Sequence, residues 1–564
     1  MNKRILTKGG LTLLAGAALY SCSLMKDVEY EVKEDPIEMH GDKVTVNIDG
    51  KFVEKGLNKK AYIELTPTLV NEAGNELEFD MKSFQGPKAA GNGEVVDKGG
   101  KSFNYTSTKP YNPAFENAEL IVKYRVEKGG KEKLNDKTPK IADATIVTPL
   151  WLQDDDKVVY GEDKLVRKFD KVEKAQINYL KAKHDVRSSE LKEQDILDLE
   201  KFMVDGQANN KITFKSIDIV SYASPEGELE KNTTLAEDRA ASAEAYLTKA
   251  FEKLNVNAVA INKNPKGEDW AGLKELIKAS NHEDKEIIIR VAEMTSDPAK
   301  REEEIKTLSS TYKFLEDDIF PQLRRSQMML NYELAGYTDE ELKTISTSKP
   351  STLTVEELLF AGNRLIVDTD AKLAIYKEAT KVAPNDWRGY NNAGVVLYTQ
   401  GKFKEAADMF KKANELDKNP VTNNNHGTSL RRDGKVDEAA ALFSSSTAAG
   451  KEVNYNLGLV NVKKGEYDQA IKNFGDYKTF NKALAQTLNE DYKSASTTLD
   501  QSADKESAKG YYLKAILASR TNDEAGVVSN LKSAIAKDSS LAAKAKKDRE
   551  FIDYFEKDAF KAIF

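Results

Sequence analysis

The sequence predicts a multidomain protein with an N-terminal β-sandwich, a central α+β domain and a C-terminal all-α repeat solenoid. Three observations lead to this prediction. Short segments of alternating polarity between Gly, Pro and Asn turns fill residues 22–150, which is typical of β-strands. Strand and helix patterns alternate across residues 151–340, and helical segments recur with a fixed period across residues 351–564. A chain of 564 residues is also too long for a single hydrophobic core.

The composition argues against several classes of function. The formal net charge is −7, positive and negative residues are mixed throughout, and no basic stripe points to a nucleic-acid partner. The four histidines are far apart and Cys22 is the only cysteine, so we expect no metal site and no disulfide. There is no phosphate-binding glycine loop and no nucleophile elbow. We therefore predict a protein without cofactor or catalytic residues.

The first 21 residues have the pattern of a signal peptide. A basic start with Lys3, Arg4 and Lys8 precedes the apolar run "LTLLAGAALY", which at ten residues is much shorter than a membrane-spanning helix. The following "LYSC", Leu19 to Cys22, resembles the lipobox of bacterial lipoproteins. That resemblance implies acylation of Cys22 and attachment to the outer membrane through the lipid. An ordinary secretory signal that happens to contain a cysteine is the alternative.

The first domain, residues 22–150, carries several strand signals. Val44, Val46 and Ile48 alternate with polar neighbours in "KVTVNIDGKF", and the segments "AYIELTPTLV", "LEFDMKSF", "KSFNYTST" and "AELIVKYRVEKGG" repeat this pattern. Several short alternating strands separated by turns favour a β-sandwich. No spacing in this region indicates a catalytic motif, so we interpret the domain as a spacer or interaction domain.

The central domain, residues 151–340, is expected to combine strands with helices. Strands are predicted in "AQINYLKAKHDV", "ITFKSIDIVSYA" and "FPQLRRSQMMLNYEL", and a helical insertion is clearest in "EDWAGLKELIKAS". The carboxylate pairs Asp154–Asp156 and Glu302–Glu304 lie in charged runs that we interpret as solvated segments. General acid–base catalysis requires carboxylates in a shaped, apolar-lined site, so these pairs are weak catalytic candidates.

One stretch of this domain, Ser221 to Leu247, suggests an anion site. A strand ends at a turn with Pro225 and Gly227. The spacing of Thr234 and Glu237 predicts that Thr234 caps the following helix. Arg239 would then lie in the second helical turn, where unpaired backbone N–H groups and a guanidinium together favour a carboxylate ligand.

The same stretch resembles the OmpA-like peptidoglycan-binding domain of diderm bacteria. Asn232, Leu235, Arg239 and Ala240 match the family's helix motif, and "LRRSQMML" resembles its closing strand. The resemblance covers roughly Lys171 to Leu334. It implies that Asn232 and Arg239 belong to a site for the diaminopimelate of peptidoglycan, in which the arginine binds the carboxylate and a turn aspartate binds the ammonium group.

The chain departs from that family at the turn. Ser224 stands where the aspartate is expected, and a hydroxyl cannot neutralise an ammonium group. Glu226 is a candidate replacement for the missing carboxylate. The alternatives are that the domain keeps its fold but has lost or changed the ligand, or that Arg239 forms an ion pair with Glu226 or Asp238 that only supports the fold.

The third region, residues 351–564, contains a repeat. Gly394, Gly427 and Gly458 recur at intervals of 31–33 residues, and a second glycine follows each of them after seven residues. Alanine and phenylalanine then keep the same register, at Ala406, Ala439 and Ala470 and at Phe410, Phe443 and Phe474. This pattern resembles the tetratricopeptide repeat, in which two antiparallel helices pack closely through small residues. The resemblance implies a protein partner bound to the repeats.

Candidate partner contacts are polar residues on the first helices of the repeats, namely Asn391, Asn392, Asn424 and Asn456, unless these are simply solvated. The favoured hypothesis is a non-catalytic outer-membrane lipoprotein on the periplasmic side that links the membrane, and possibly peptidoglycan, to a protein complex. One alternative is a surface-exposed lipoprotein that captures ligands. The other is an enzyme acting on cell-wall material or glycans.

Overall fold

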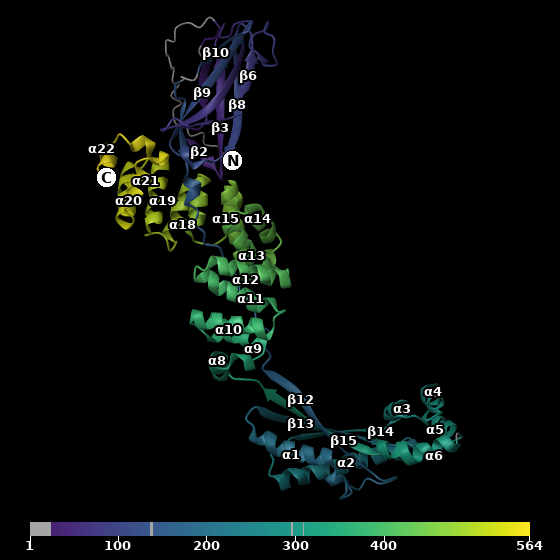
Figure 1. The fold of residues 1–564 in the computed structure, drawn as a ribbon. Coiled ribbons are helices and arrows are strands. Elements are labelled where there is room, and N and C mark those ends of the chain that lie inside the picture. The colour runs from purple at the N-terminus through teal and green to yellow at the C-terminus, as the bar shows by residue number, and fades with distance from the viewer. Residues whose placement is uncertain (1–23, 27, 136–138, 295–296, 308) are drawn as a thin grey trace. The chain divides into compact units, whose positions relative to one another are not determined.

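The computed structural model describes residues 24–26, 28–135, 139–294, 297–307 and 309–564. The chain forms two compact units. The first contains the described residues up to Glu162 together with Val367–Phe564, and the second contains Asp163–Ile366. The second unit is therefore an insertion between the sheet-rich and helical parts of the first (Figure 1). The predicted multidomain organisation, with a sheet-rich N-terminal region and an all-helical C-terminal region, is confirmed.

The N-terminal region is built from strands that enclose one core. Alternate residues of β3 and β4 are buried, which explains the alternating polarity of their sequences. The core combines side chains such as Val46, Ile63, Phe84 and Leu120. Because β2 pairs with both β3 and β11, the strands follow one continuous pairing path. The strands are β1 (Val28–Val32), β2 (Ile37–His40), β3 (Lys43–Phe52), β4 (Tyr62–Asn71), β5 (Glu76–Glu78), β6 (Lys82–Gln85), β7 (Glu94–Val95), β8 (Lys101–Pro110), β9 (Ala118–Lys128), β10 (Lys131–Asn135) and β11 (Ala142–Ile146).

The second unit contains a sheet of four strands in the order β12-β15-β13-β14. Neighbouring strands are antiparallel except β13 and β14, which are parallel. Buried residues such as Ile217, Ile219 and Leu330 from the sheet pack against Leu199 and Leu247 from the helices. The strands are β12 (Lys168–Asn178), β13 (Ile212–Ala223), β14 (Ala260–Glu268) and β15 (Arg325–Ala335), and the two helices of this core are α1 (Gln194–Ala208) and α2 (Leu229–Leu254).

A helical insertion with its own small core separates β14 from β15. Its buried residues include Leu273, Ile277, Ile305 and Phe320. The predicted helix around "EDWAGLKELIKAS" is α3, but sequence reasoning missed β14, whose Pro265 and Gly267 are poor strand formers. The helices are α3 (Trp270–Ala279), α4 (Lys285–Met294), α5 (Pro298–Lys306), α6 (Ser309–Phe314) and α7 (Phe320–Leu323), and α8 (Asp339–Ser348) and α9 (Val355–Phe360) follow β15.

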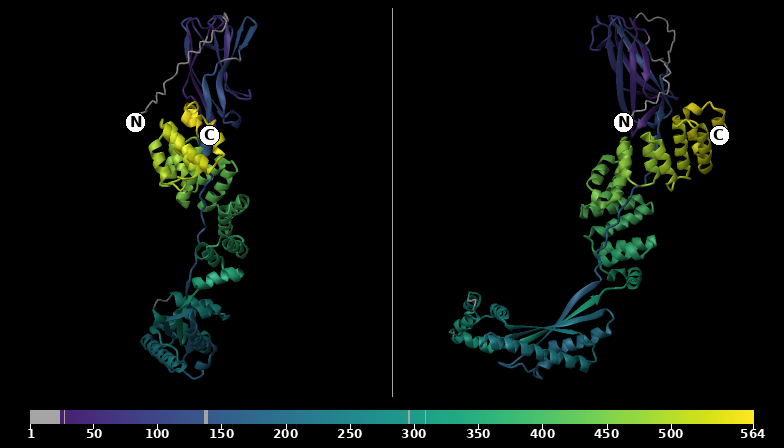
Figure 2. Two further views of the ribbon diagram at one scale, coloured as in Figure 1. Left: turned by 90° about the vertical axis from the view of Figure 1, so that its left-hand side faces the viewer. Right: turned by 180° about the vertical axis from the view of Figure 1, so that it is seen from behind.

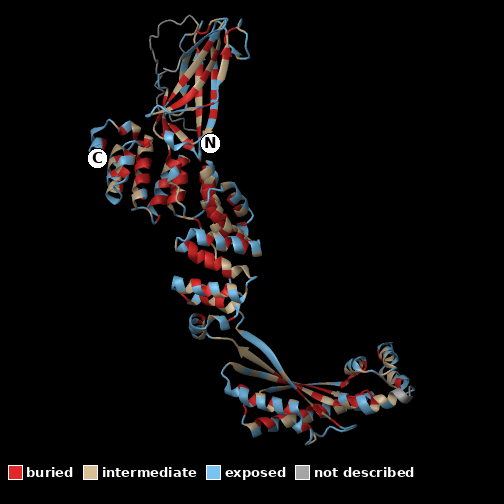
Figure 3. Ribbon diagram, in the orientation of Figure 1, coloured by how far each residue is buried: buried red, intermediate tan, exposed pale blue. Residues whose placement is uncertain are grey.

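The C-terminal region consists of antiparallel helix pairs. Its helices are α10 (Thr369–Val382), α11 (Trp387–Thr399), α12 (Phe403–Leu416), α13 (Pro420–Arg432), α14 (Val436–Ser444), α15 (Lys451–Lys464), α16 (Tyr467–Phe474), α17 (Phe480–Leu488), α18 (Tyr492–Asp500), α19 (Ala508–Arg520), α20 (Glu524–Lys537), α21 (Leu541–Ala545) and α22 (Asp558–Lys561). Burial concentrates on the first helix of each pair, as the red segments of α11, α13 and α15 show (Figure 3). No helix among the described residues is long and apolar enough to cross a membrane.

The repeating glycines make the helix pairs possible. A Cβ atom added to Gly394, Gly427 or Gly458 would come within 2.6–2.7 Å of the ring of Phe410, Phe443 or Phe474, respectively. These rings are fully buried, so any side chain at the glycine would force the two helices apart. The periodic Gly and Phe positions are therefore the close contacts between helices.

Candidate functional site

The site lies along the first helices of the repeats, where the chain's own linker is bound. Residues 153–161, here called the strap, have no regular secondary structure and connect the sheet-rich region to the second unit. In the view from behind, this segment appears as a thin blue thread that follows the green helices (Figure 2). The strap runs against the order of the repeats, because Gln153 contacts α17 and Gly161 contacts α11.

Asparagine side chains hold the backbone of the strap. At four strap residues an asparagine accepts a hydrogen bond from the N–H and donates one to the C=O of the same residue, with distances of 2.7–2.9 Å. The pairs are Asn481 with Gln153, Asn456 with Lys157, Asn425 with Val159 and Asn392 with Gly161. Because the strap contributes only its backbone N–H and C=O groups to these bonds, they do not depend on the strap's side chains.

The asparagines also bond to one another, except Asn481, which bonds to Tyr455 instead. We call the whole set the asparagine ladder. Asn425 donates to Asn391 at 2.8 Å and Asn456 donates to Asn424 at 2.9 Å, so consecutive repeats are linked. Asn391 and Asn424 donate in addition to the carbonyl oxygens of Val159 and Lys157. The four asparagines that the sequence singled out are fully buried, so the solvated interpretation does not apply to them. They contact a segment of the same chain.

Sequence reasoning missed two members of the ladder. Asn392, Asn425 and Asn456 each precede a repeat glycine by two residues, and Asn481 precedes Ala483 in the same way. Two residues correspond to about 200° around a helix, so the asparagine faces the strap while the small residue faces the paired helix. Extending the repeat register to this position would have found Asn425 and Asn481.

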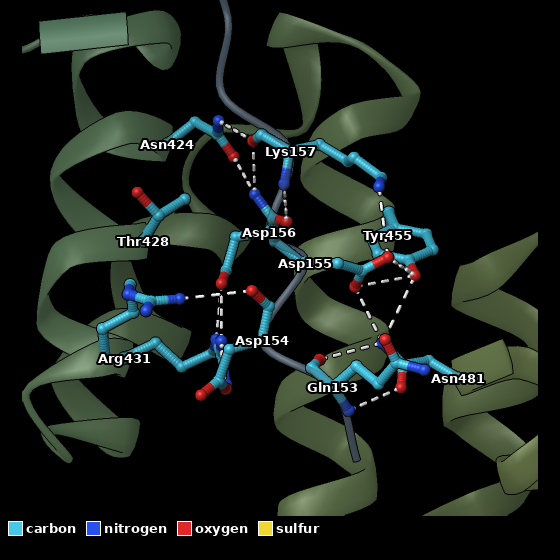
Figure 4. A network of polar contacts seen from close by, with 12 residues as sticks. Gln153, Asp154, Asp155, Asp156, Lys157, Asn424, Thr428, Arg431, Tyr455 and Asn481 are labelled. Atoms are coloured by element: carbon cyan, nitrogen blue, oxygen red, sulfur yellow. Dashed lines mark hydrogen bonds and ion pairs between the residues drawn. The ribbon is translucent and has the colours of Figure 1, made fainter. Parts of the chain in front are cut away.

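A buried ion pair fixes the acidic part of the strap. Arg431 of α13 donates through Nη2 to Asp154 at 2.8 Å and through Nε and Nη2 to Asp156. Burial opposes the charge of Arg431, but the hydrogen bonds that it donates to Asp156 and Asp154 and the negative charges of these carboxylates outweigh this effect and raise its pKa. Figure 4 shows both aspartates directed at Arg431. The prediction that this acidic run is solvated was wrong for Asp156, whose side chain is 0 % exposed because the guanidinium compensates its charge.

Aspartates of the strap also contact α11, α15 and α17. Asp155 accepts hydrogen bonds from Tyr455 at 2.7 Å and from Asn481 at 2.7 Å (Figure 4). Tyr398 donates to Asp156 at 3.2 Å. An open pocket of about 560 Å³ lies beside the strap and is lined by Asp154, Asp156, Lys157, Val158, Tyr398, Thr399, Phe403, Glu452 and Tyr477. Two of the carboxylates that line it, Asp154 and Asp156, already accept hydrogen bonds from Arg431 of the repeats.

In the second unit, Arg239 does not form an open anion site. Its side chain is 0 % exposed, and it donates to the carbonyl oxygens of Lys183, Tyr222 and Leu180 at 3.0, 2.8 and 3.3 Å. Burial lowers the pKa of Arg239 to about 10. The guanidinium therefore links three backbone segments of the core. Neither of the expected partners, Glu226 and Asp238, provides one of these three acceptors.

The other three predicted residues lie together around a different arginine. Glu226 accepts from Arg324 at 2.6 Å and pairs with Lys181 at 3.1 Å. Ser224 donates to Glu226 at 2.6 Å, and Asn232 donates to the Glu226 carbonyl at 3.3 Å. The carboxylate that was expected to replace the missing aspartate is thus neutralised by cations of the same chain.

The start of α2 also differs from the prediction. The helix begins at Leu229 after Glu228, so Thr234 is not its N-cap but lies inside the helix and donates to the Glu230 carbonyl at 3.2 Å. Arg239 consequently lies in the third turn, on the buried stripe between Ala236 and Ala243, away from the unpaired N–H groups. The argument for an anion site at the helix start does not hold.

Two further expectations concern lipid and metal. Cys22, the predicted acylation site, lies outside the described residues. Among the residues that the structure describes, no group of three or more His, Cys, Asp or Glu side chains is placed to hold a metal ion.

Glu302 of the second predicted carboxylate pair accepts a hydrogen bond from the backbone of Gly227 and pairs with Lys306.

Comparisons with known proteins support the assignment of the repeats. The tetratricopeptide repeat family model matches residues 369–419 and 424–477. The chain is similar to PilF of Pseudomonas aeruginosa (19% identity, 38% of this chain and 97% of that chain, TM-score 0.27). It is also similar to YrrB, a tetratricopeptide repeat protein with an unusual peptide-binding site (20% identity, 37% of this chain and 100% of that chain, TM-score 0.23). A third similar structure is the APC/C hetero-tetramer Cut9–Hcn1 (13% identity, 59% of this chain and 72% of that chain, TM-score 0.30). No curated protein sequence matches the chain. The repeats suggest a scaffold for protein–protein interaction.

Proposed function

We propose that this protein is a non-catalytic scaffold of the outer membrane, anchored by an acylated Cys22 and facing the periplasm, whose repeats engage a protein partner. The lipobox-like "LYSC" and the preceding apolar run support the anchor and the location. The repeat match supports the interaction role. An acyl anchor of several chains would hold the protein stably on the membrane.

The asparagine ladder is the observation that carries the interaction role. It presents buried amide groups from successive repeats to the backbone of an extended polypeptide, with Asn392, Asn425, Asn456 and Asn481 each bonded to one residue. Solenoid surfaces of this kind bind extended segments through a few side chains from each repeat. Asp156, one of the candidate catalytic carboxylates, is instead held in an ion pair by Arg431, which argues against a role for it in acid–base catalysis.

Peptidoglycan binding is not part of this proposal. Arg239 is enclosed by carbonyl groups, and Glu226 is paired with Arg324 and Lys181. Sedimentation with purified cell-wall sacculi tests this directly. We expect the wild-type protein to stay in the supernatant. Sedimentation that free diaminopimelate reverses would restore the wall-tether hypothesis.

Fractionation of the native envelope tests the anchor. We expect the wild-type protein in the outer membrane and the Cys22→Ser variant in a soluble fraction, because the variant lacks the acylated thiol. Protease treatment of intact cells distinguishes the periplasmic location, in which the protein is protected, from the surface-exposed alternative, in which it is cleaved.

Cross-linking in intact envelopes tests the scaffold role. After solubilisation in detergent, the protein should purify with a stoichiometric partner, and the tagged partner should recover this protein in return. Recovery of this protein alone in both directions would contradict the proposal.

A further inference from the structure

The repeat surface that would receive a partner is filled by the strap, and the two fit closely. The ladder holds backbone groups at Gln153, Lys157, Val159 and Gly161. These bonds are available to any extended polypeptide that carries N–H and C=O groups at the same intervals. Backbone contacts alone therefore do not select the strap over another segment.

Selectivity comes from two positions of the strap. Arg431 has only 2% of its side chain exposed, so an occupant of this surface must bring a carboxylate to the position of Asp156. At Gly161, an added Cβ would lie 2.9 Å from the Trp387 ring, so the occupant needs a glycine there or a shift of that ring. The required ligand is an extended acidic segment with a small residue five positions after the paired aspartate.

Its partial exposure and the separate packing of the repeat helices distinguish the strap from a buried core segment. It has no regular secondary structure, and several of its side chains are only half-buried, including Lys157 and Val158. The repeat helices have their own packing through buried Phe410, Phe443 and Phe474. The strap is thus bound on the surface of a framework that already has a core.

We propose that the strap is an internal ligand that occupies the asparagine ladder, and that an extended acidic segment of a partner protein binds by taking its place. This inference deepens the proposed scaffold function, because it names the chemistry of the partner. The covalently attached strap competes at a high effective concentration, so the wild-type protein binds such segments weakly until the strap is released.

Hydrogen exchange of the unmodified full-length protein tests whether the strap opens on its own. We expect the bonded amides of the strap to exchange through a local opening while α13 and α15 remain protected. Exchange of strap and helix amides at one common rate, set by global unfolding, would overturn the proposal, because the strap would then be an inseparable part of the repeat fold.

A peptide titration tests replacement. The probe is a labelled synthetic peptide of residues 153–162. The protein is the full chain with Asp156→Asn and Val159→Pro, which remove a carboxylate and an N–H from the strap but leave the residues of the repeats unchanged. We expect this variant to bind the peptide at least about tenfold more tightly than the wild type. Adding Asn425→Ala to the same variant should abolish the gain, and a peptide with its Asp156 changed to Asn should bind more weakly.

Three results would overturn the proposal. These are equal binding to wild type and variant, binding that is insensitive to Asn425→Ala, and loss of helical circular dichroism in the variant. Each of them leaves the scaffold function itself testable, because the recovery of a partner from cross-linked envelopes does not depend on the peptide.

Discussion

Two buried arginines, one in each unit, show how differently this protein uses the same side chain. Arg239 in α2 is surrounded by backbone carbonyl oxygens, and burial lowers its pKa to about 10. Arg431 in α13 faces two carboxylates of the strap, and its pKa is raised. The first arginine fastens the core of its own unit. The second recognises charge on a segment that lies on the surface of the repeats.

The largest effect is expected for Arg431→Met. Methionine has similar bulk but leaves the fully buried carboxylate of Asp156 without a cation. Breaking a buried pair in this way costs about 3–5 kcal/mol, here in the free energy that holds the strap on the repeats. Hydrogen exchange of strap peptides should show this loss as reduced protection. Unchanged protection would mean that the ladder alone holds the strap.

A smaller effect is expected for Arg239→Met. The change leaves the carbonyl oxygens of Leu180, Tyr222 and Lys183 without this donor, but it also removes a costly buried charge. We expect a loss of about 1–3 kcal/mol in the free energy of unfolding of the second unit. Urea denaturation followed by exchange of α2 peptides measures it. A loss larger than that of Arg431→Met would reverse the comparison.

Asp548 is a buried carboxylate like Asp156, but its hydrogen-bond donors are a tyrosine and a backbone N–H and not an arginine. Asp548 accepts from Tyr512 and from the backbone of Glu550, and burial together with the charge of Glu550 raises its pKa to about 6. Because the folded-state pKa is raised above the ordinary value of 3.8, this group's contribution to stability is fully present below pH 3.8 and is lost as the pH rises through about 6.

We therefore expect Asp548→Asn to stabilise the first unit at pH 7.5 by about 1–2 kcal/mol and to have little effect near pH 4. Thermal or urea unfolding at the two pH values measures this difference. An equal effect of the substitution at both values would contradict the assignment of the raised pKa to Asp548.

The smallest effect is expected for Asp154→Asn. Asp154 contacts the same guanidinium as Asp156, but 54% of its side chain is exposed. Water and salt screen such a pair, so the free energy that holds the strap on the repeats should fall by less than about 1 kcal/mol. Exchange of strap peptides in this variant is the matched control for Arg431→Met. A loss as large as in that variant would show that the exposed carboxylate is the principal partner.

The sequence was sufficient to predict the repeats but not their occupant. Gly394, Gly427 and Gly458 mark close helix contacts that any homologous repeat needs, so their period is visible in one sequence. The strap has no periodicity, and its partners lie 231–328 residues further along the chain. Nothing local in "QDDDKVVYG" indicates burial, because the compensating Arg431 is supplied by a distant helix.

In the second unit the sequence motif was found, but the surroundings of its arginine were predicted wrongly. Motif matching found Asn232 and Arg239 on one helix, but the position of the helix start decides what the arginine faces. The chain enters the helix at Leu229 rather than at Thr234, which places Arg239 on the stripe that packs against the sheet. Capping spacing is a weak signal when a turn with Pro225 and Gly227 already starts the helix earlier.

The attachment of the strap at several points has a consequence for how it can leave the repeats. Its backbone is held at four residues by four different asparagines, so the loss of one pair leaves the other three in place. Dissociation of the whole strap therefore requires that all four pairs open, and each pair that stays closed keeps the neighbouring strap residues close to their own asparagines.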